Sequence, residues 1–350
     1  MKRMTIFLLL LFVFTDNQAQ NNSKKYNIRT IAFYNLENLF DTINNPKTND
    51  ESSPIMKIKG NRAEVYWDKI NKLAAVISKI GLEKSNTSPA IIGVAEAENR
   101  TVLEDLIRTE FLKGKGYEII HYQSPDNRGI DVAFLYQKHY FKPVYHEAFN
   151  PRIYQENRKV YTRDQLLVSG YLDDELIHIV VNHWPSRRGG VVKSQQLREK
   201  AAYQNVKIIQ QIRKTDADAK IIIMGDFNDN PTNTSLKKVL KTKAKKSRVQ
   251  EGDLYNPFET LFEQGLNTLG YRDNINLFDQ ILISSSLLKP TIKGATSFKF
   301  FRASIFNKRF LTTKKGRFKG YPFRSFSYGR YIGGYSDHYP VYVYLIKEVN

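Results

Sequence analysis

The sequence predicts an α+β fold in which β-sheet dominates. Short apolar runs alternate with amphipathic segments from residue 28 onward, and several predicted strands follow one another without a helix between them. Such a succession favours antiparallel pairing, which a simple doubly wound sheet does not have. No segment rich in Pro, Gly or Ser divides the chain after residue 25. We therefore expect a single domain over residues 25–350.

The N-terminus has the pattern of a signal peptide. The basic start "MKR" is followed by the apolar run "MTIFLLLLFVF", which is too short to span a bilayer comfortably. We expect a signal peptide over residues 1–19, with cleavage near Ala19 or Gln20. The mature protein would then be exported to the periplasm or secreted. An uncleaved membrane anchor is the alternative.

Apolar runs of strand length mark the sheet. The predicted strands lie at residues 28–36, 89–99, 129–137, 165–172, 175–184, 221–224, 276–284 and 338–346. A long helix over about residues 195–213 precedes the strand at 221–224. Because the strands at 129–137, 165–172 and 175–184 follow one another, we expect antiparallel pairing among them.

Two further helices are predicted in the first part of the chain. Residues 67–82 form an amphipathic pattern that ends at Gly81. One face of this helix carries four apolar residues, namely Ile70, Leu73, Ala74 and Ile77. The next helix is predicted to begin at a capping box of Thr101 and Glu104 and to end near Phe111.

Charge and cysteine content restrict the function classes. The net charge is +19 and the pI is about 9.7, so the surface favours polyanions such as nucleic acid, anionic lipid or acidic polysaccharide. Cysteine is absent, which excludes disulfides, thiolate zinc sites and a cysteine nucleophile. Any bound metal must therefore be held by oxygen or imidazole ligands.

Polar side chains end or interrupt the predicted strands. In "IIIMGDFNDNP", the apolar strand runs directly into Asp226 and Asn228. The other strand ends carry Asn35, Glu37, Glu96, Glu98, Asn182, His183, Asp279, Asp337 and His338. Each alone fits a turn, a cap or a satisfied core group, but together they indicate one site at the carboxyl ends of strands.

The residue types at these strand ends suit phosphate ester hydrolysis. Carboxylate and amide oxygens select Mg²⁺, Mn²⁺ or Ca²⁺ over zinc, and Mg²⁺ also binds phosphate oxygens. An imidazole with an Asp behind it is an oriented acid, base or electrostatic clamp. These are the parts of metal-assisted hydrolysis of phosphodiesters or phosphomonoesters.

The order of the motifs resembles a known superfamily. "FYNLEN", "GVAEAEN", "RGIDVAFLY", "VVNHW", "IIIMGDFNDNP", "NLFDQILIS" and "YSDHYPV" follow one another as in the endonuclease/exonuclease/phosphatase superfamily. "GDFND" and "SDHYPV" are the most specific of these motifs. The resemblance implies a four-layer sandwich of the DNase-like type, in which helices flank two packed mixed β-sheets. It also implies a Mg²⁺-dependent hydrolase of phosphate esters, with Mn²⁺ or Ca²⁺ as alternative cofactors.

The same resemblance implies a metal site. Asn35 and Glu96 match positions at the metal, and Asp337 lies beside them. Glu98 is on the same predicted strand face as Glu96 and is a further candidate ligand.

Five residues carry catalytic roles by resemblance. Asp226 would orient or deprotonate the attacking water, and Asn228 would hold the scissile phosphate. His338 would contact that phosphate while Asp279 receives its other ring N–H. His183 would stabilise charge near the leaving oxygen or donate a proton to it.

Basic residues near these motifs indicate the substrate. Residues 299–335 carry many Lys and Arg among Phe and Tyr and contain no acidic residue, with Arg317 and Lys319 as candidate contacts. Nucleic-acid binding and a solvated loop both fit this segment. Arg187 and Arg188 follow His183 closely enough to clamp a phosphate, and Arg128 is a candidate on weaker grounds.

The leading hypothesis is an exported Mg²⁺-dependent nuclease acting on DNA or RNA. The alternative is a phosphatase or phospholipid phosphodiesterase acting on inositol phosphate, sphingomyelin or another anionic phospholipid. A third hypothesis is a nucleic-acid-binding protein with an inactive site. We expect a monomer without an obligate protein partner.

Overall fold

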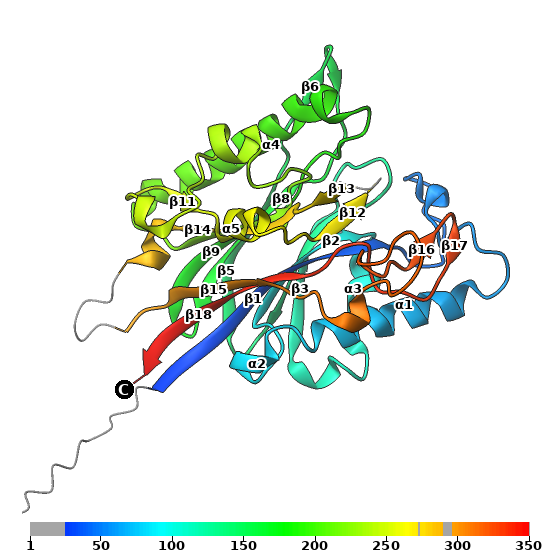
Figure 1. The fold of residues 1–350 in the computed structure, drawn as a ribbon, viewed down its shortest axis with the longest axis horizontal. Coiled ribbons are helices and arrows are strands. Elements are labelled where there is room, and N and C mark those ends of the chain that lie inside the picture. The colour runs from blue at the N-terminus through cyan, green and yellow to red at the C-terminus, as the bar shows by residue number, and fades with distance from the viewer. Residues whose placement is uncertain (1–24, 272–273, 290–295, 350) are drawn as a thin grey trace, which may run out of the picture.

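The computed structural model describes residues 25–271, 274–289 and 296–349, so the predicted signal peptide lies outside the described residues. Two six-stranded mixed sheets form the centre of the fold (Figure 1). Within the described ranges, every helix is too short or too polar to cross a bilayer.

The first sheet has the strand order β15-β18-β1-β2-β4-β3. Its strands are β1 Lys25–Leu39, β2 Ile91–Ala97, β3 Tyr117–His121, β4 Asp131–Gln137, β15 Lys299–Ile305 and β18 Val341–Val349. β1 pairs parallel to β2 and antiparallel to β18, so the first and last strands of the described chain lie side by side in the middle of this sheet (Figure 1).

The second sheet has the strand order β11-β14-β10-β9-β8-β5. Its strands are β5 Phe141–Phe149, β8 Gln165–Leu172, β9 Glu175–His183, β10 Ile221–Asp226, β11 Leu254–Tyr255 and β14 Asp279–Ser284. β10 is parallel to β9 and antiparallel to β14. The expected antiparallel pairing of consecutive strands is confirmed for β8 and β9. It is wrong for β4 and β8, because β4 pairs with β2 and β3 in the first sheet.

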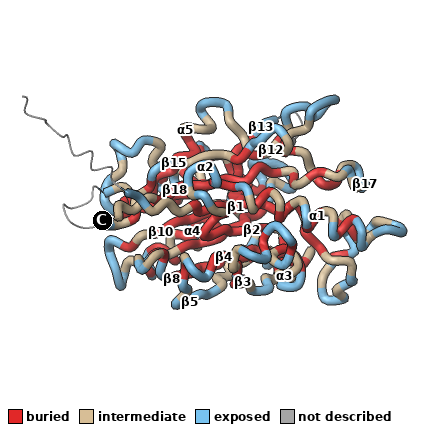
Figure 2. Tube along the Cα trace, turned by 90° about the horizontal axis from the view of Figure 1, so that it is seen from below, coloured by how far each residue is buried: buried red, intermediate tan, exposed pale blue. Residues whose placement is uncertain are grey.

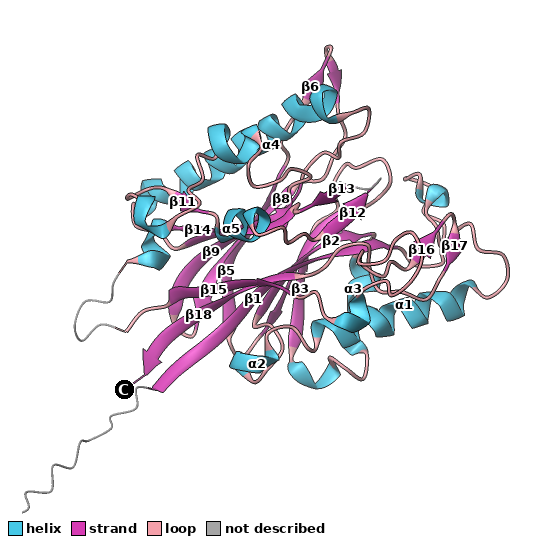
Figure 3. Ribbon diagram, in the orientation of Figure 1, coloured by secondary structure: helices cyan, strands magenta, loops and turns pink. Residues whose placement is uncertain are grey.

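Helices cover the outer faces of the two sheets (Figure 3). They are α1 Arg62–Ile77, α2 Leu82–Ser85, α3 Arg100–Arg108, α4 Val191–Thr215 and α5 Pro257–Glu263. Short 3-10 turns lie at Asp50–Ser52, Lys113–Lys115, Lys246–Arg248, Ser285–Leu288 and Arg309–Leu311, and a π-helical turn at Ser235–Val239. Three small hairpins complete the fold: β6 Tyr154–Gln155 with β7 Arg158–Lys159, β12 Leu269–Tyr271 with β13 Asn274–Asn276, and β16 Phe326–Ser327 with β17 Arg330–Tyr331.

The layers are held by three apolar clusters. α1 and α3 pack on the first sheet, α4 packs on the second, and a third cluster fills the space between the sheets. Buried positions accordingly run along the central strands, and exposed positions gather in the loops (Figure 2). Gly93 lets the sheets approach closely, because an added Cβ there would lie 2.6 Å from Met224 Sδ. The predicted four-layer sandwich is confirmed.

Some sequence predictions of local structure need correction. The predicted capping box is wrong, because Asn99 caps α3 by accepting a hydrogen bond from the Val102 N–H at 3.1 Å. Glu104 instead pairs with Arg100 at 2.9 Å along the helix surface. α3 ends at Arg108 and α1 begins at Arg62, earlier than predicted. Strands β3, β5 and β15 were not predicted.

Candidate active site

Strand register gathers the predicted catalytic residues at one end of the second sheet. Asp226 is the last residue of β10 and lies opposite His183 in the parallel partner β9. On its other side Asp226 lies opposite Asp279, the first residue of the antiparallel strand β14. A carboxylate, an imidazole and a second carboxylate therefore share one sheet edge because of how these three strands pair.

The Asn35 side chain joins the two sheets at this edge. Its amide Nδ2 donates to Glu96 Oε1 at 3.3 Å, within the first sheet, and to Asp226 Oδ2 at 3.1 Å, in the second. Its Oδ1 accepts a hydrogen bond from the Glu37 N–H at 2.9 Å. Asn35 is fully buried, so its position is fixed by these contacts.

Several residues here have left-handed backbone conformations. The φ angle is +63° at Glu96, +50° at Glu37, +48° at Asn38 and +50° at Asn228. Each such conformation costs roughly 1–3 kcal/mol in a non-glycine residue and persists only where the surroundings enforce it. At Glu96 the turn points the side chain to the site, where Oε2 accepts a hydrogen bond from the Asn38 N–H at 2.8 Å.

His338 and Asp279 form a tight buried pair. His338 Nδ1 lies 2.7 Å from Asp279 Oδ2. Burial alone would lower the pKa of His338, but the charges of Asp279, Asp226 and Asp337 outweigh it and raise this pKa well above its ordinary value. His338 is therefore a protonated imidazole at neutral pH, with Nδ1–H given to Asp279 and Nε2–H directed elsewhere.

The pKa of Asp226 is raised as well, but burial acts in the other direction from its effect on His338. Burial is the main cause that raises the pKa of this carboxyl to about 7, and the neighbouring Asp279 and Glu96 add to it against the lowering effect of His338. A carboxyl that titrates near neutral pH is suited to taking a proton from water. The Asn228 N–H holds Asp226 Oδ1 at 2.9 Å, which leaves Oδ2 facing the site.

His183 is a neutral imidazole next to the carboxylates. Burial, followed by the charges of Arg163 and Arg128, lowers the pKa of His183 well below its ordinary value. Its Nε2 lies 3.6 Å from Asp226 Oδ2 and 3.8 Å from Glu96 Oε1. Its Nδ1 has no hydrogen-bond partner among the described residues.

The donor set fits a divalent cation that prefers oxygen ligands. Asn35 and Glu96 are in contact, and Ser336 Oγ donates to the Asn35 carbonyl at 2.7 Å, which brings the adjacent Asp337 to the same place. Carboxylate oxygens of Asp226 and Asp279 also lie within 4.8 Å of each other, whereas the protonated His338 ring beside them has no free nitrogen for a metal. Asp279 Oδ1 is buried without a hydrogen-bond partner in the described part of the chain. Such clustered carboxylates are stabilised when a cation neutralises them.

Glu98 does not join Glu96 as expected. Its Oε2 accepts a hydrogen bond from the Asp41 N–H at 2.7 Å, and its side chain lines a neighbouring cavity. Burial raises the pKa of Glu98 to about 7, and Asp41 and Asp50 contribute to the shift. The left-handed turn at Glu96 interrupts the strand alternation on which the expectation for Glu98 depended.

Arg187 supports a loop rather than presenting a free guanidinium. Its Nε donates to the Asn228 carbonyl at 2.9 Å, and its Nη2 donates to Asn233 Oδ1 at 3.0 Å and Asp229 Oδ1 at 3.3 Å. These bonds fix the loop that follows β10 and position Asn228. The phosphate contact of Arg187 stays a prediction. Arg188 is exposed beside it.

Arg163 is a buried residue that the sequence did not indicate. Its Nε donates to the His183 carbonyl at 3.1 Å, and its Nη1 bonds to Asp126 Oδ2 at 3.0 Å. Arg128, a predicted substrate contact, lies on the other oxygen of Asp126 at 3.3 Å. The sequence around Arg163 gives no indication that it supports His183, because this contact depends on how the strands pack in the folded protein.

The basic segment is anchored directly to the site. Glu37 accepts hydrogen bonds from the Ser325 N–H at 2.6 Å and the Phe326 N–H at 3.2 Å. The buried Lys69 on α1 donates to Ser325 Oγ at 2.7 Å. Arg324 Nη2 lies 3.9 Å from Asp337 Oδ2.

The predicted contacts Arg317 and Lys319 are exposed on the same segment. Lys69 was missed, although a lysine within the apolar stripe of a helix, next to Ile70, is a recognisable signal of a buried charge.

Comparison with known proteins agrees with this arrangement. A model of the Endonuclease/Exonuclease/phosphatase family matches residues 30–347. The chain belongs to this family. The resemblance inferred from the motifs is thereby confirmed, and members of the family are in general divalent-metal-dependent phosphoester hydrolases. No match was found among curated proteins.

Solved structures of the family share the fold. A mannosyl-6-phosphatase of Bacteroides thetaiotaomicron matches with a TM-score of 0.54 and 17% identity, covering 91% of this chain and 99% of that one. D. rerio TDP2 complexed with a single-strand DNA product gives 0.53 and 14%, covering 91% and 98%. A further family protein of B. thetaiotaomicron gives 0.53 and 17%, covering 93% and 96%. At these identities the likeness extends to the fold alone.

Proposed function

We propose that this protein is an exported, Mg²⁺-dependent phosphoester hydrolase whose leading substrate class is nucleic acid. The observation that carries the catalytic part is the Asn35 amide, which bridges Glu96 and Asp226 beside the His338–Asp279 pair. The exposed basic segment next to Asp337 supports a polyanionic substrate. The basic and apolar N-terminus supports export, which N-terminal sequencing of the mature protein would test.

Each of the predicted catalytic residues would have its own role in the reaction. Asp226 orients the water and takes its proton, because its carboxyl titrates near neutral pH. His338 donates Nε2–H to a nonbridging phosphate oxygen, and Asp279 holds the ring in that orientation.

Asn228 uses one amide hydrogen on the Trp184 carbonyl at 3.0 Å and retains the other for the phosphate. His183 faces the leaving oxygen. A cation held by Asn35, Glu96 and Asp337 would supply charge neutralisation at the phosphate.

A phosphatase is the second candidate. A cavity beside the site is lined by Glu98, Asp126 and Asp131, which disfavour a second phosphate group there. A small phosphorylated molecule with an uncharged remainder fits that side of the site better than a continuous phosphate backbone.

The function is tested with a substrate panel and metal removal. We expect the protein to hydrolyse plasmid DNA, RNA or a phosphomonoester in Mg²⁺ and to lose this activity in EDTA, with recovery on adding Mg²⁺. Sphingomyelin and inositol phosphates belong in the same panel. Turnover that resists EDTA would contradict the metal assignment, and no turnover on any ester would favour the inactive-site hypothesis.

Variants of two residues test the site itself. Replacing Asp226 or His338 with Ala should lower kcat by about 10²–10⁴-fold, because each removes a proton-transfer or charge-stabilising group. His146→Ala is the matched control, since His146 is exposed on the edge strand β5, where its ring contacts Tyr122. Circular dichroism and thermal melting must show that the variants fold, and wild-type kinetics in either Ala variant would exclude the assignment.

A further inference from the structure

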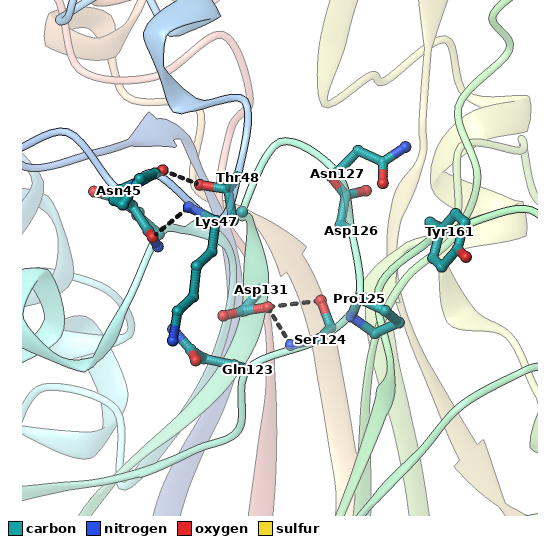
Figure 4. Close-up of a pocket in the computed structure, with 13 residues that line it drawn as sticks. Asn45, Lys47, Thr48, Gln123, Ser124, Pro125, Asp126, Asn127, Asp131 and Tyr161 are labelled. Carbon is teal, nitrogen blue, oxygen red and sulfur yellow. Dashed lines mark hydrogen bonds between the residues drawn. The ribbon is translucent and has the colours of Figure 1, made fainter.

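A cavity of about 490 Å³ opens beside the catalytic residues. Its walls are the loop at residues 45–48, the loop leading into β4, Glu98 and Tyr161 (Figure 4). Cavities of about 300–1,000 Å³ hold small molecules. The size of this cavity therefore suits one compact group rather than a polymer.

Two links connect the cavity with the active site. Glu98 follows two residues after Glu96 at the end of β2. Asp126, on the opposite wall, is bonded by Arg163, which also holds the His183 carbonyl. The cavity thus lies on the His183 side of the phosphate site, where the proposed mechanism places the leaving oxygen.

The charge of the lining disfavours a second phosphate. Glu98, Asp126 and Asp131 line the cavity, and Lys47 is the one basic lining residue among the described residues. Each of the three carboxylates has a partner, since the Asp41 N–H donates to Glu98 at 2.7 Å, Arg163 bonds Asp126 and Ser124 Oγ donates to Asp131 at 2.6 Å. The lining nevertheless contains more acidic than basic residues, which disfavours an anion.

The uncharged lining groups suit a molecule rich in hydroxyls. Gln123 and Asn127 are amides that both donate and accept hydrogen bonds, which matches the two roles of a hydroxyl. Tyr161 is half exposed, at 50%, at the edge of the cavity across from Lys47, and Lys159 Nζ lies 5.2 Å from the centroid of its ring (Figure 4). An aromatic face packs against the C–H surface of a ring while its polar tip stays in water.

We propose that this cavity binds the sugar ring attached to the scissile phosphate. The inference rests on the proposed function and specifies its substrate class as a sugar phosphate ester. A hexose phosphate and the ribose of a nucleotide share this chemistry. The acidic wall then favours hydroxyls over further phosphates on the leaving side.

Kinetics on matched esters tests the cavity. The test compares three phosphate esters, namely mannose 6-phosphate, a 5′-ribonucleotide and ethyl phosphate. Each is also assayed as its methyl diester. The first two carry a sugar ring on the phosphate, and ethyl phosphate does not. We expect the wild type to prefer a ring ester over the ethyl ester by at least about tenfold in kcat/KM. Tyr161→Ala and Gln123→Ala should reduce this preference about tenfold, mainly through KM, since the first removes the aromatic ring and the second the amide that would contact the sugar.

Tyr154→Ala is the matched control, because Tyr154 is equally exposed, at 50%, but lies on the β6 hairpin. This variant should keep the wild-type preference. Equal rates for ring and ethyl esters in the wild type, or equal losses on both in Tyr161→Ala, would overturn the proposal. Whichever of the two ring esters is hydrolysed faster shows whether the cavity binds a hexose or the ribose of a nucleotide.

A binding measurement separates this proposal from the proposed function. Unphosphorylated mannose and ribose are titrated into the Mg²⁺-loaded protein and followed by NMR. We expect shifts at Gln123 and Tyr161 in the wild type and at least tenfold weaker binding in Tyr161→Ala. If no ester is hydrolysed but the sugar binds here, the proposed function fails and the cavity assignment stands. If esters are hydrolysed but neither sugar binds at millimolar concentration, the cavity assignment fails.

Discussion

At the scale of single residues, the site depends on charges whose partners come from distant parts of the chain. Asp126 illustrates this, because its carboxylate bonds Arg163, which fixes the carbonyl of His183. Burial would raise the pKa of Asp126, but Arg163 and Arg128 outweigh it and hold the pKa below its ordinary value of 3.8. The folded protein therefore binds fewer protons here than the unfolded chain does.

This depressed pKa gives a stability prediction with a defined sign. The contribution of Asp126 is fully present above pH 3.8 and is lost as the pH falls below it. We expect Asp126→Asn to lower the free energy of unfolding by about 3 kcal/mol at pH 7, because Arg163 becomes a buried charge without its partner. The gap between variant and wild type should narrow below pH 4 in urea-unfolding experiments, since the wild type loses its own ion pair there.

Glu110→Gln is the control for this measurement. Glu110 forms an ion pair with Lys113 in which the side chains are 81% and 57% exposed. Exposed pairs contribute about 0–1 kcal/mol, so this variant should show little change at any pH. A constant difference between Asp126→Asn and wild type from pH 7 to pH 3 would contradict the assigned role.

Residues of the site could be predicted from the sequence where a short motif contains them. Asp226, Asp279 and His338 stand at strand ends in specific motifs, and strand pairing brings them together. Arg163 and Lys69 were not found, because their roles depend on which strand or loop faces them in the folded chain. Arg187 was assigned to the phosphate because proximity in sequence does not show that Asn228 and Asp229 occupy its guanidinium.

At the scale of elements, the buried pair of Glu37 and Lys69 fixes the β16–β17 segment on the first sheet. Lys69 is 1% exposed and Glu37 4% exposed, and both bond to Ser325. Burial and the charge of Asp337 raise the pKa of Glu37 to about 7, while Lys69 acts in the opposite direction. Burial lowers the pKa of Lys69, while Glu37 and Asp337 act against this lowering. The two side chains are linked through Ser325, to which both are hydrogen-bonded.

A double-mutant cycle measures this pair. At pH 8, Glu37→Gln and Lys69→Met should each lower the free energy of unfolding by about 1–3 kcal/mol, because each removes a partner of the buried Ser325. The double variant should cost less than the sum of the two, since both side chains belong to one hydrogen-bond network. The single variants should also be cleaved faster by trypsin within residues 306–335.

The exposed pair of Arg100 and Glu104 provides a comparison cycle, with side chains 56% and 31% exposed. Its coupling should be about 0.3–0.5 kcal/mol. Strictly additive effects of Glu37→Gln and Lys69→Met would show that the two side chains act independently.

The elements were predicted well where apolar patterns are long, and less well elsewhere. β1, β8, β9 and α4 follow from periodicity alone. β5 was missed because most of its residues are exposed or half-buried on the edge of the second sheet, so its apolar content is low. The capping box was misplaced because Asn99 competes as an N-cap directly before the helix.

At the scale of the whole molecule, substrate binding should depend on where the positive side chains lie and not on the net charge of +19 alone. Lys315 and Lys319 are exposed on the segment that reaches Asp337, whereas Lys238 and Lys245 are exposed after β10, away from the predicted catalytic motifs. Changing either pair to Glu alters the net charge by the same amount. Only the first pair should matter if the segment binds the substrate.

We expect Lys315→Glu with Lys319→Glu to weaken single-stranded DNA binding most at low salt. The slope of log K against log salt should fall by about 1–2, because about 0.7 counterions are released per phosphate contact. Fluorescence anisotropy in the presence of EDTA, in which we expect no hydrolysis of the strand, measures this slope. Identical slopes for the two double variants would show that the segment carrying Lys315 and Lys319 does not contact the DNA.

The pairing of β1 with β18 also makes the reactive centre depend on two distant parts of the domain. Asp337 and His338 immediately precede β18, while Asn35 lies on β1. The candidate site is therefore complete only when β18 has paired with β1. A partly folded chain in which these two strands are apart should hydrolyse no phosphate ester, even if both sheets have otherwise begun to form.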